Sequence, residues 1–468
     1  MGVKKNQVPH VVVVPYPAQG HINPLLQFAK RLASKGVKST IATTHYTVSS
    51  ISAHNVGVEA ISDGFDEGGY AQAKDVGLFL ESFKIHGSNT LSQLLQKFQN
   101  SSFPVTCVVY DAFFPWALDV AKQHGICAAS FFTNSATICT IFARVHHGLL
   151  ELPLKMEDEE VSLIPGLPPF RPQDLSSFLR RPESYPAYLA MKLSQFDNLD
   201  KADWIFGNTC EALEAQVVKN SAELWPAKLI GPMVPSAYLD GRIKDDKGYG
   251  GSLWKPLGDE CSNWLKTKPS NSVVYVSFGS MASLNTQQME ETAWGLKQSG
   301  MNFIWVVKEK DQFHLPEVFM DLKREQGLIV PWCNQLEVLA HEATGCFVTH
   351  CGWNSTLEGL SLGVPMVGVP QWADQLTNAK FVDEIWEVGV RAKEDSDGVV
   401  RKEELVRCLK EVMESKRSEY MKANAKKFRE LCKEAIGEGG SSDKNINAFI
   451  DQLMHLSTNG FNKVSLQV

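Results

Sequence analysis

The chain has 468 residues, of which 44% are hydrophobic and 21% charged, so we expect a globular protein with two domains of roughly 200 residues each. A net charge of −7 argues against a nucleic-acid binder, because phosphate contact needs a basic surface. The sequence shows no secretory signal and no membrane span, and its ten cysteines form no CxxC pair. We therefore expect a cytoplasmic protein with reduced thiols and no structural zinc.

The first half of the chain alternates strand and helix patterns. The run HVVVVPY at 10–16 predicts a buried parallel strand, and a loop at 17–24 leads to a helix at 25–36 with Gly36 at its cap. Further patterns predict strands at 37–44, 105–111 and 126–133, and a helix at 115–125. This alternation is typical of parallel βαβ units.

Two stretches lack such periodicity. Residues 152–174, rich in proline and acid, predict a long surface loop of the lid or pocket-rim type. Residues 241–252, rich in glycine and charge, predict an interdomain linker. We therefore predict domains over 1–240 and 253–440, and the periodicity at the end of the chain predicts a helix at about 441–468 that packs back on the first domain.

The second half shows another α/β series, whose predicted strands lie at 272–280, 302–307, 345–351 and 365–370. Predicted helices follow at 285–300, with Asn285 or Thr286 as cap, at 354–363 and at 374–386. The pattern thus predicts a doubly wound α/β domain in each half, and in such domains ligands bind outside the carboxyl ends of the strands.

The stretch THCGWNSTLEG, at 349–359, admits several kinds of chemistry. His350 and Cys351 are adjacent on a strand, so their side chains point to opposite faces and do not suit one metal ion. Nothing nearby marks Cys351 as an activated nucleophile, and GLSLG at 359–363 has strand and helix in the wrong order for a serine hydrolase elbow. A phosphate cradle at the helix start fits, and so does simple capping by Asn354 and Ser355.

The wider context favours the cradle. The 44 residues from Trp332 to Gln375 resemble, nearly position for position, the donor-binding signature of plant family 1 UDP-sugar glycosyltransferases, and the likeness extends over essentially the whole chain. Within that family the chain looks closest to the group acting on carboxylates, phenolics and triterpenoids. One departure is Asn334, where a proline is usual.

The resemblance implies a GT-B fold, with an N-terminal acceptor-binding domain facing a C-terminal UDP-sugar-binding domain across a cleft. It also implies how the donor is held. Trp332 would stack on uracil, the Cys333 backbone would pair with the uracil edge, and Gln335 and Glu358 would hold the ribose. The diphosphate would be held by Ser280, His350, Gly352, Asn354 and Ser355. Asp374 and Gln375 would hydrogen-bond the sugar, Thr133 would lie near it, and Gly20 and Trp353 are also expected at the donor site. In the family a final glutamine goes with glucose, so UDP-glucose is the expected donor.

A catalytic pair is expected at the edge of the first sheet. His21 lies between the first strand and the first helix, and Asp111 closes the strand at 105–111. The matching residues of the family act as general base and orienting carboxylate, which would fix the tautomer of His21 and stabilise the imidazolium that forms. The residues alone also allow a plainer interpretation, in which His21 is a polar loop residue that caps a helix and Asp111 is a turn former at the end of a strand.

The resemblance implies an inverting transfer to a hydroxyl or carboxyl oxygen of an apolar small molecule, by a monomer without metal or cofactor. Candidates for the acceptor pocket, expected in the first domain, are Phe113, Phe114, Phe131, Phe178 and Tyr185. Three other classes of protein have two α/β domains of this kind. A UDP-sugar epimerase and a non-catalytic UDP-sugar-binding protein share this architecture, whereas a nicotinamide dehydrogenase would need a GxGxxG after a strand, which the sequence lacks.

Overall fold

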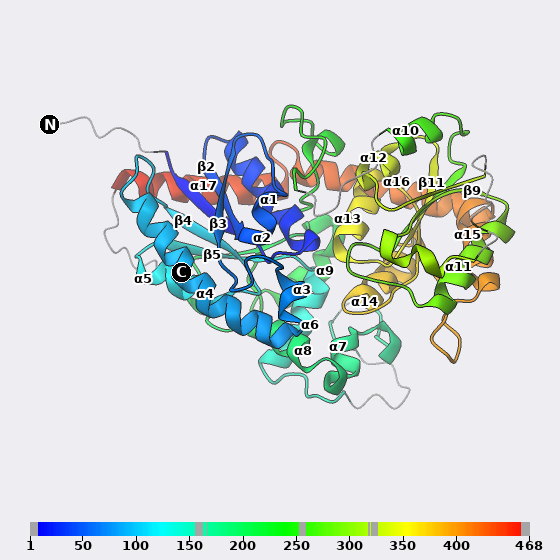
Figure 1. Ribbon diagram of the computed structural model, residues 1–468, viewed down its shortest axis with the longest axis horizontal. Coiled ribbons are helices and arrows are strands. Elements are labelled where there is room, and N and C mark those ends of the chain that lie inside the picture. Colours follow the sequence, from blue (N-terminus) through cyan, green and yellow to red (C-terminus); the bar gives the residue numbers. More distant parts are fainter. Residues whose placement is uncertain are drawn as a thin grey trace. The chain divides into compact units, whose positions relative to one another are not determined.

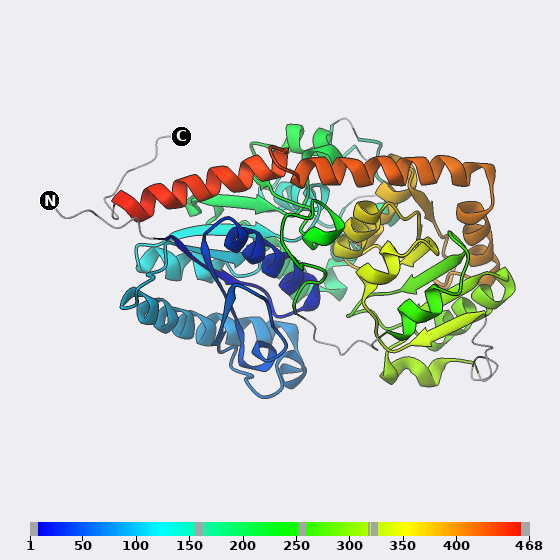
Figure 2. The same ribbon diagram turned by 90° about the horizontal axis from the view of Figure 1, so that it is seen from above.

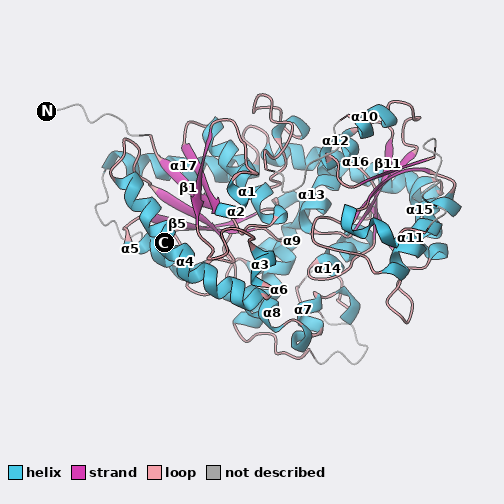
Figure 3. Cartoon of the chain, in the orientation of Figure 1, coloured by secondary structure: helices cyan, strands magenta, loops and turns pink. Residues whose placement is uncertain are grey.

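The structure is a computed structural model that describes residues 8–154, 162–165, 167–251, 259–316, 319 and 326–459 (Figure 1). The chain forms two compact units, each with strands flanked by helices (Figure 3). The first unit comprises Met1–Leu154, Arg181–Leu253 and Glu434–Val468, and the second comprises Lys155–Arg180 and Trp254–Lys433. Residues 155–180 thus group with the second unit, whereas the sequence-based boundary placed them in the first domain.

The described part of the first unit contains a seven-stranded parallel sheet in the order β3-β2-β1-β4-β5-β6-β7. Its strands are β1 (His10–Val14), β2 (Lys38–Thr44), β3 (Val56–Ile61), β4 (Cys107–Asp111), β5 (Cys127–Phe132), β6 (Trp204–Gly207) and β7 (Lys228–Leu229). Its helices include α1 (Gln19–Ser34), α2 (His45–Val48), α3 (Tyr70–Ala73), α4 (Val76–Gln99), α5 (Pro115–Gln123), α6 (Ala136–His146), α8 (Pro186–Ser194), α9 (Glu211–Ser221) and α17 (Ser441–Asn459).

Aromatic side chains fill both faces of this sheet. On one face Phe28 of α1 packs against Phe131, Phe206 and Phe449, the last of these from α17. On the other face Phe79, Phe83, Phe114 and Trp116 join α4 and α5 to the strands. Burial of apolar surface of this extent is the main stabilising contribution to the fold.

The last helix belongs to the first unit and is seen lengthwise in Figure 2, coloured red. Asn445 of α17 donates to the backbone carbonyl of Leu229 in β7 at 2.7 Å, and Phe449 packs edge-on against Trp204 of β6 at 5.4 Å. Residues 460–468 of the predicted helix lie outside the described residues.

The predicted linker is pinned to α1 within the described range 241–251. Asp246 accepts from Lys30 Nζ at 2.8 Å and from Gln27 Nε2 at 2.7 Å, and all three residues are buried. Buried charges are found where they are paired in this way. The described part of this stretch therefore belongs to the first unit and is fixed to α1.

The described part of the second unit contains a six-stranded parallel sheet in the order β10-β9-β8-β11-β12-β13. Its strands are β8 (Val273–Ser277), β9 (Asn302–Val306), β10 (Gly327–Val330), β11 (Thr344–Thr349), β12 (Met366–Gly368) and β13 (Gly389–Arg391). Its helices include α7 (Ser177–Arg180), α10 (Glu260–Leu265), α11 (Thr286–Ser299), α12 (Gln335–Ala340), α13 (Trp353–Leu362), α14 (Gln375–Lys380) and α15 (Lys402–Met413), and α16 (Lys416–Ile436) runs to the end of this unit and three residues into the first.

The segment before α7 joins the second unit through a buried carboxylate. Asp174 lies 2.7 Å from Arg391 Nη1 and 3.3 Å from Lys380 Nζ, and its backbone carbonyl accepts from Thr377 Oγ1 at 2.7 Å. These contacts explain why the described end of the predicted lid belongs with the second unit, while residues 155–161 and 166 of that loop lie outside the described residues.

Candidate active site

His21 and Asp111 meet at the carboxyl edge of the first sheet. His21 lies in the first turn of α1, directly after β1, and Asp111 is the last residue of β4. The strands β1 and β4 are neighbours, and the strand order reverses between them, which is where ligands bind in such sheets. Asp111 Oδ2 lies 2.6 Å from His21 Nδ1.

The backbone holds the carboxylate in place. Asp111 Oδ1 accepts from the Phe113 N–H at 3.1 Å, and Oδ2 accepts from the Tyr16 N–H at 3.4 Å. The Asp111 side chain is 1% exposed and that of His21 is 17% exposed. A buried carboxylate at Nδ1 favours the tautomer whose proton lies on Nδ1, which leaves the lone pair of Nε2 to take a proton.

Thr133 completes this cluster. It follows β5, and its Oγ1 lies 3.2 Å from His21 Nδ1. The helix after it is anchored by Glu214, whose carboxylate accepts from the N–H groups of Ala136 and Thr137, both at 2.9 Å. Burial raises the pKa of Glu214 above its usual value. The carboxylate thus fixes the chain just beyond Thr133.

Aromatic rings surround the imidazole. The Phe113 ring lies 4.7 Å from that of His21, between ring centres, and the Tyr16 ring lies 5.2 Å away. Both aromatic residues are nearly buried. An apolar surface of this kind lowers the local dielectric and strengthens the hydrogen bond between His21 and Asp111.

A second constellation lies at the carboxyl edge of the second sheet, where the strand order reverses between β8 and β11. Ser280 follows β8, and His350 and Gly352 follow β11. The imidazole of His350 fills the space between two glycines, because an added Cβ would come within 2.7 Å of the ring at Gly279 and within 2.4 Å at Gly352. Only glycine fits at these positions, and Gly279 also has a positive φ of 76°.

His350 is neutral at physiological pH. Burial lowers its pKa to about 4, and the positive charge of Lys308 adds to this effect. Lys308 is itself buried, and its Nζ donates to the Ala282 carbonyl at 2.5 Å, which fixes the turn after β8 that carries Ser280. A neutral imidazole can donate one ring N–H to an anion.

The turn before α13 is strained and has no side-chain cap. Cys351 has a φ of +60°, and its carbonyl accepts from Asn378 Nδ2 at 2.9 Å. Gly352 is the N-cap residue of α13, whereas Asn354 and Ser355 lie inside the helix, after Trp353. Capping by Asn354 or Ser355, the plainer of the two interpretations, is therefore not what the structure shows. Burial raises the pKa of the Cys351 thiol to about 12, so it is no ready nucleophile.

A hydrogen-bond chain joins the residues expected at the nucleoside. Gln335 Nε2 donates to Ser355 Oγ at 3.1 Å and to Glu358 Oε2 at 2.5 Å, and Gln335 Oε1 accepts from the Tyr275 hydroxyl at 3.2 Å. Trp332, at the end of β10, is half-buried. A hydrogen bond to Cys261 and burial raise the pKa of the Cys333 thiol well above its usual value, which agrees with an incidental role for that thiol.

Asp374 and Gln375 lie in a turn that follows β12. Gln375 Oε1 accepts from the N–H groups of Gln371 and Trp372 at 2.9 and 3.1 Å. Asp374 Oδ2 accepts from Asn378 Nδ2 at 2.8 Å. Ala373, just before Asp374, has a φ of +57°, and its N–H donates to Ser177 Oγ at 2.9 Å. The turn is thus held rigidly in an unusual conformation.

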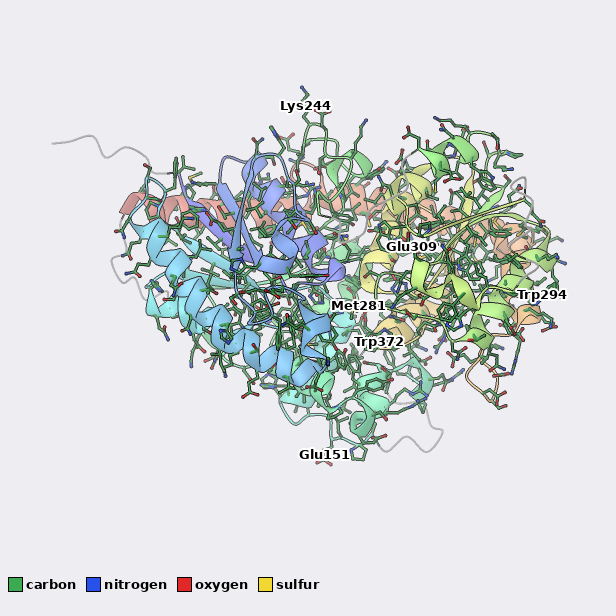
Figure 4. All side chains as sticks on the ribbon, viewed as in Figure 1. Glu151, Lys244, Met281, Trp294, Glu309 and Trp372 are labelled. Carbon is green, nitrogen blue, oxygen red and sulfur yellow. The ribbon has the colours of Figure 1, made fainter. Side chains whose placement is uncertain are left out.

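The five residues predicted for the acceptor pocket do not lie together. Phe113 lies beside His21, but Phe114 and Phe131 are buried in the core of the first unit, against Phe83 and Phe28 respectively. Phe178 is in the second unit and packs edge-on against Trp372, which Figure 4 labels. Tyr185 is half-buried at the start of α8 in the first unit. Of these five side chains, Phe113 alone has a described ring contact with His21.

Sequence reasoning missed several residues that the structure places at these two sites. The sequence marks Tyr16 only as the end of a predicted strand, and long-range packing brings Glu214, Tyr275 and Lys308 to the sites. No local sequence pattern predicts that an ionisable side chain will be buried. Of these residues, only Lys308 has a position, just after a strand, that could have suggested a place at the site.

Within the described ranges, no group of three or more His, Cys, Asp or Glu residues could hold a metal ion. Nor does that part of the chain include a helix both long and apolar enough to cross a membrane. All ten cysteines are free thiols.

Comparison with known proteins decides the family. Residues 210–435 match the family model for UDP-glucoronosyl and UDP-glucosyl transferase, and residues 7–66 match that of a glycosyltransferase N-terminal domain. The sequence is 51% identical to UDP-glycosyltransferase 74B1 of Arabidopsis thaliana, over 95% of this chain and 97% of that protein. The chain belongs to the UDP-glycosyltransferase family.

Further relatives agree. The glycosyltransferase is 43% identical to a flavonol 7-O-beta-glucosyltransferase of Arabidopsis thaliana, over 95% of this chain and 98% of that protein. The crystal structure of Os79 from O. sativa in complex with UDP matches with a TM-score of 0.90 and 39% identity, over 95% of this chain and all of that one. Another crystal structure of Os79 holds U2F and a trichothecene. The predicted family and the predicted GT-B fold class are confirmed, and the glycosyltransferase transfers a sugar from a UDP-sugar.

Proposed function

We propose that the glycosyltransferase moves glucose from UDP-glucose to a hydroxyl or carboxyl oxygen of an apolar small molecule, with inversion at the anomeric carbon. His21 acts as the general base and Asp111 orients it. The observation that carries this proposal is the 2.6 Å contact between His21 Nδ1 and the buried carboxylate of Asp111, at the reversal point of the first sheet. A base held in this way contributes roughly 10²–10⁴-fold to such a reaction.

In the proposed step, Nε2 of His21 takes the proton from the acceptor oxygen. That oxygen forms a bond to the anomeric carbon, and the bond from this carbon to the phosphate oxygen breaks. UDP leaves with the electron pair, and Asp111 stabilises the imidazolium until the proton is lost to water. A carboxyl acceptor is already ionised at neutral pH and needs His21 only for positioning.

The second sheet supplies the donor site. Trp332 stacks on uracil, the backbone of Cys333 pairs with its edge, and Gln335 and Glu358 accept from the ribose hydroxyls. Neutral His350, the hydroxyl of Ser280 and the first turn of α13 with Asn354 and Ser355 hold the diphosphate. The close approach that Gly352 allows, with His350 seated against it, supports this assignment. These donors stabilise the charge that develops on UDP.

Three residues contact the sugar in this proposal: Asp374, Gln375 and Trp353. The Oε1 atom of Gln375 is engaged by two backbone N–H groups, which orients the side chain with Nε2 as the donor to a sugar hydroxyl. Thr133 contacts the sugar from beside His21, and Gly20 at the start of α1 lets the phosphates approach. The acceptor lies against Phe113 and Tyr16, and we propose that the enzyme works as a monomer in the cytoplasm.

The test is calorimetry with UDP-glucose, UDP-galactose, UDP and NAD, with a chelator present throughout. We expect binding of the UDP species, tighter binding of UDP-glucose than UDP-galactose, and none of NAD. No binding of UDP, or binding that appears only when a divalent metal replaces the chelator, would overturn the assigned donor site.

A further inference from the structure

The turn that carries Asp374 and Gln375 is held by a serine from a distant part of the chain. Ser177, the first residue of α7, lies 196 positions before Ala373 and pairs with it at two points. Ser177 Oγ accepts from the Ala373 N–H at 2.9 Å, and the Ser177 N–H donates to the Ala373 carbonyl at 3.2 Å. The serine thus holds both backbone polar groups of this one residue.

Ala373 needs such support because its backbone is strained. Its φ of +57° lies in the left-handed region, which a residue with a Cβ seldom adopts. A strained residue persists only where its surroundings fix it. The N–H belongs to the peptide group that joins Trp372 to Ala373, and the carbonyl belongs to the group that leads to Asp374. Because Ser177 bonds to both peptide groups, it fixes the φ and ψ of Ala373 together.

The segment around Ser177 is itself anchored in the second unit. Asp174, three residues earlier, has a buried carboxylate paired with the two cations described above, and its carbonyl accepts from Thr377 of α14 at 2.7 Å. On the other side of Ser177, the Phe178 ring packs edge-on against Trp372 at 5.7 Å between ring centres. Contacts on both sides of the serine therefore reach the same turn and the helix that follows it.

The sugar-facing residues of the turn depend on the conformation of Ala373. Gln375 Oε1 accepts from the N–H groups of Gln371 and Trp372, so these hydrogen bonds connect residues before Ala373 with a residue after it. Asp374, the next residue, has its carboxylate fixed from α14. A rotation of the backbone at Ala373 would break the first set of bonds and move the two side chains relative to each other.

We propose that Ser177 is a positioning residue for the sugar donor: by holding Ala373 in the left-handed conformation, it orients Asp374 and Gln375 towards the sugar hydroxyls. This inference rests on the proposed function, in which these two side chains contact the sugar. The contacts proposed for uracil and ribose come from α12, from α13 and from the residues that follow β10. Loss of the serine hydroxyl therefore weakens use of the sugar donor and leaves binding of the nucleotide nearly unchanged.

The experiment compares the native enzyme with Ser177→Ala at a saturating concentration of one acceptor. We expect kcat/KM for UDP-glucose to fall roughly 3- to 15-fold, the usual worth of one lost hydrogen bond together with the strain that it held. Calorimetry on the same protein should give a Kd for UDP within about twofold of the native value, which also shows that the second unit is folded. The matched control Ser270→Ala removes an exposed serine of the same unit and changes neither quantity.

A second variant tests the cause of the loss. Glycine populates the left-handed region about as readily as the right-handed one, so it needs less support at this position. Ala373→Gly, added to Ser177→Ala, should therefore raise kcat/KM for UDP-glucose at least about twofold above that of Ser177→Ala alone. A double variant with no such recovery would show that the serine does not act through Ala373, and would overturn the proposal.

Two further results would also contradict the role of Ser177. One is a Ser177→Ala enzyme whose kcat/KM for UDP-glucose stays within about threefold of the native value. The other is an affinity for UDP that falls by the same factor as kcat/KM, because a general disturbance of the unit would act on both. Failure of the native enzyme to bind UDP, or to transfer glucose to any acceptor, overturns the proposed function instead.

Discussion

Replacement of Asp111 by asparagine tests the proposed base most sharply, because the two side chains have the same shape. In the native protein both carboxylate oxygens only accept: Oδ1 from the Phe113 N–H, and Oδ2 from the Tyr16 N–H and from His21. An asparagine must place its amino group at one of these positions. If the amino group points towards Phe113, it faces the N–H of that residue, and two donors meet. If it points towards His21, it favours the tautomer that carries the proton on Nε2, and that nitrogen cannot act as a base.

The magnitude follows from these contacts. The lost charge-assisted hydrogen bond is worth about 1.5–3 kcal/mol and the buried donor left unpaired about 1–3 kcal/mol. If both terms act on the transition state, kcat falls by roughly 10²–10⁴-fold, which is also the range of general-base catalysis. The KM for UDP-glucose stays nearly unchanged, because the proposed contacts to uracil, ribose and diphosphate lie mainly in the second unit.

The assay is release of UDP at saturating UDP-glucose with a phenolic acceptor, for which a base is required. Asp119→Asn serves as the matched control, since this carboxylate on α5 is exposed, and it leaves kcat unchanged. A folded Asp111→Asn enzyme with kcat within about threefold of the native value would refute the assignment of His21 as a base oriented by this carboxylate.

Three further predictions concern the donor site and the first unit. Trp332→Ala weakens UDP binding by roughly 5- to 150-fold, the usual worth of a stacked base, which calorimetry will measure. Gly352→Ala raises the KM for UDP-glucose at least about tenfold because its Cβ would lie 2.4 Å from His350, whereas Gly248→Ala, with open space around it, leaves KM unchanged. Burial lowers the pKa of His10 to about 4, so the unfolded chain binds a proton below about pH 6.5 and the folded one does not, and stability is lost as the pH falls towards 4. Denaturant titrations at pH 7 and pH 5 measure the free energy of unfolding. Between these pH values the native protein should lose ~2 kcal/mol more than His10→Gln, and an identical pH dependence of the two proteins would refute the prediction.

Much of the fold could be predicted because parallel strands and their helices carry a local signal. The strand at 37–44 and the cap at Asn285 appear as expected, and Asn285 accepts from the Gln288 N–H at 2.8 Å. The start of α1 differs from the predicted start at residue 25. The helix begins at Gln19 and includes Pro24, although proline removes a helical hydrogen bond, because Ile22, Leu25 and Leu26 are all buried. Tertiary packing thus overrode the local rule.

The candidate site shows the same division. His21 and Asp111 could be placed together, because both lie at strand ends of one sheet edge and the topology brings those ends side by side. The acceptor side could not be predicted in this way. Phe131 and Phe113 look alike in sequence, yet one packs against Phe28 in the core and the other against His21.

The most direct test of the central claim is glucose transfer by His21→Ala at saturating UDP-glucose, with UDP binding measured on the same protein. The account predicts that kcat falls at least about 100-fold while the affinity for UDP stays within a factor of about three. A His21→Ala enzyme that binds UDP and keeps full turnover of a phenolic acceptor would contradict the proposed mechanism.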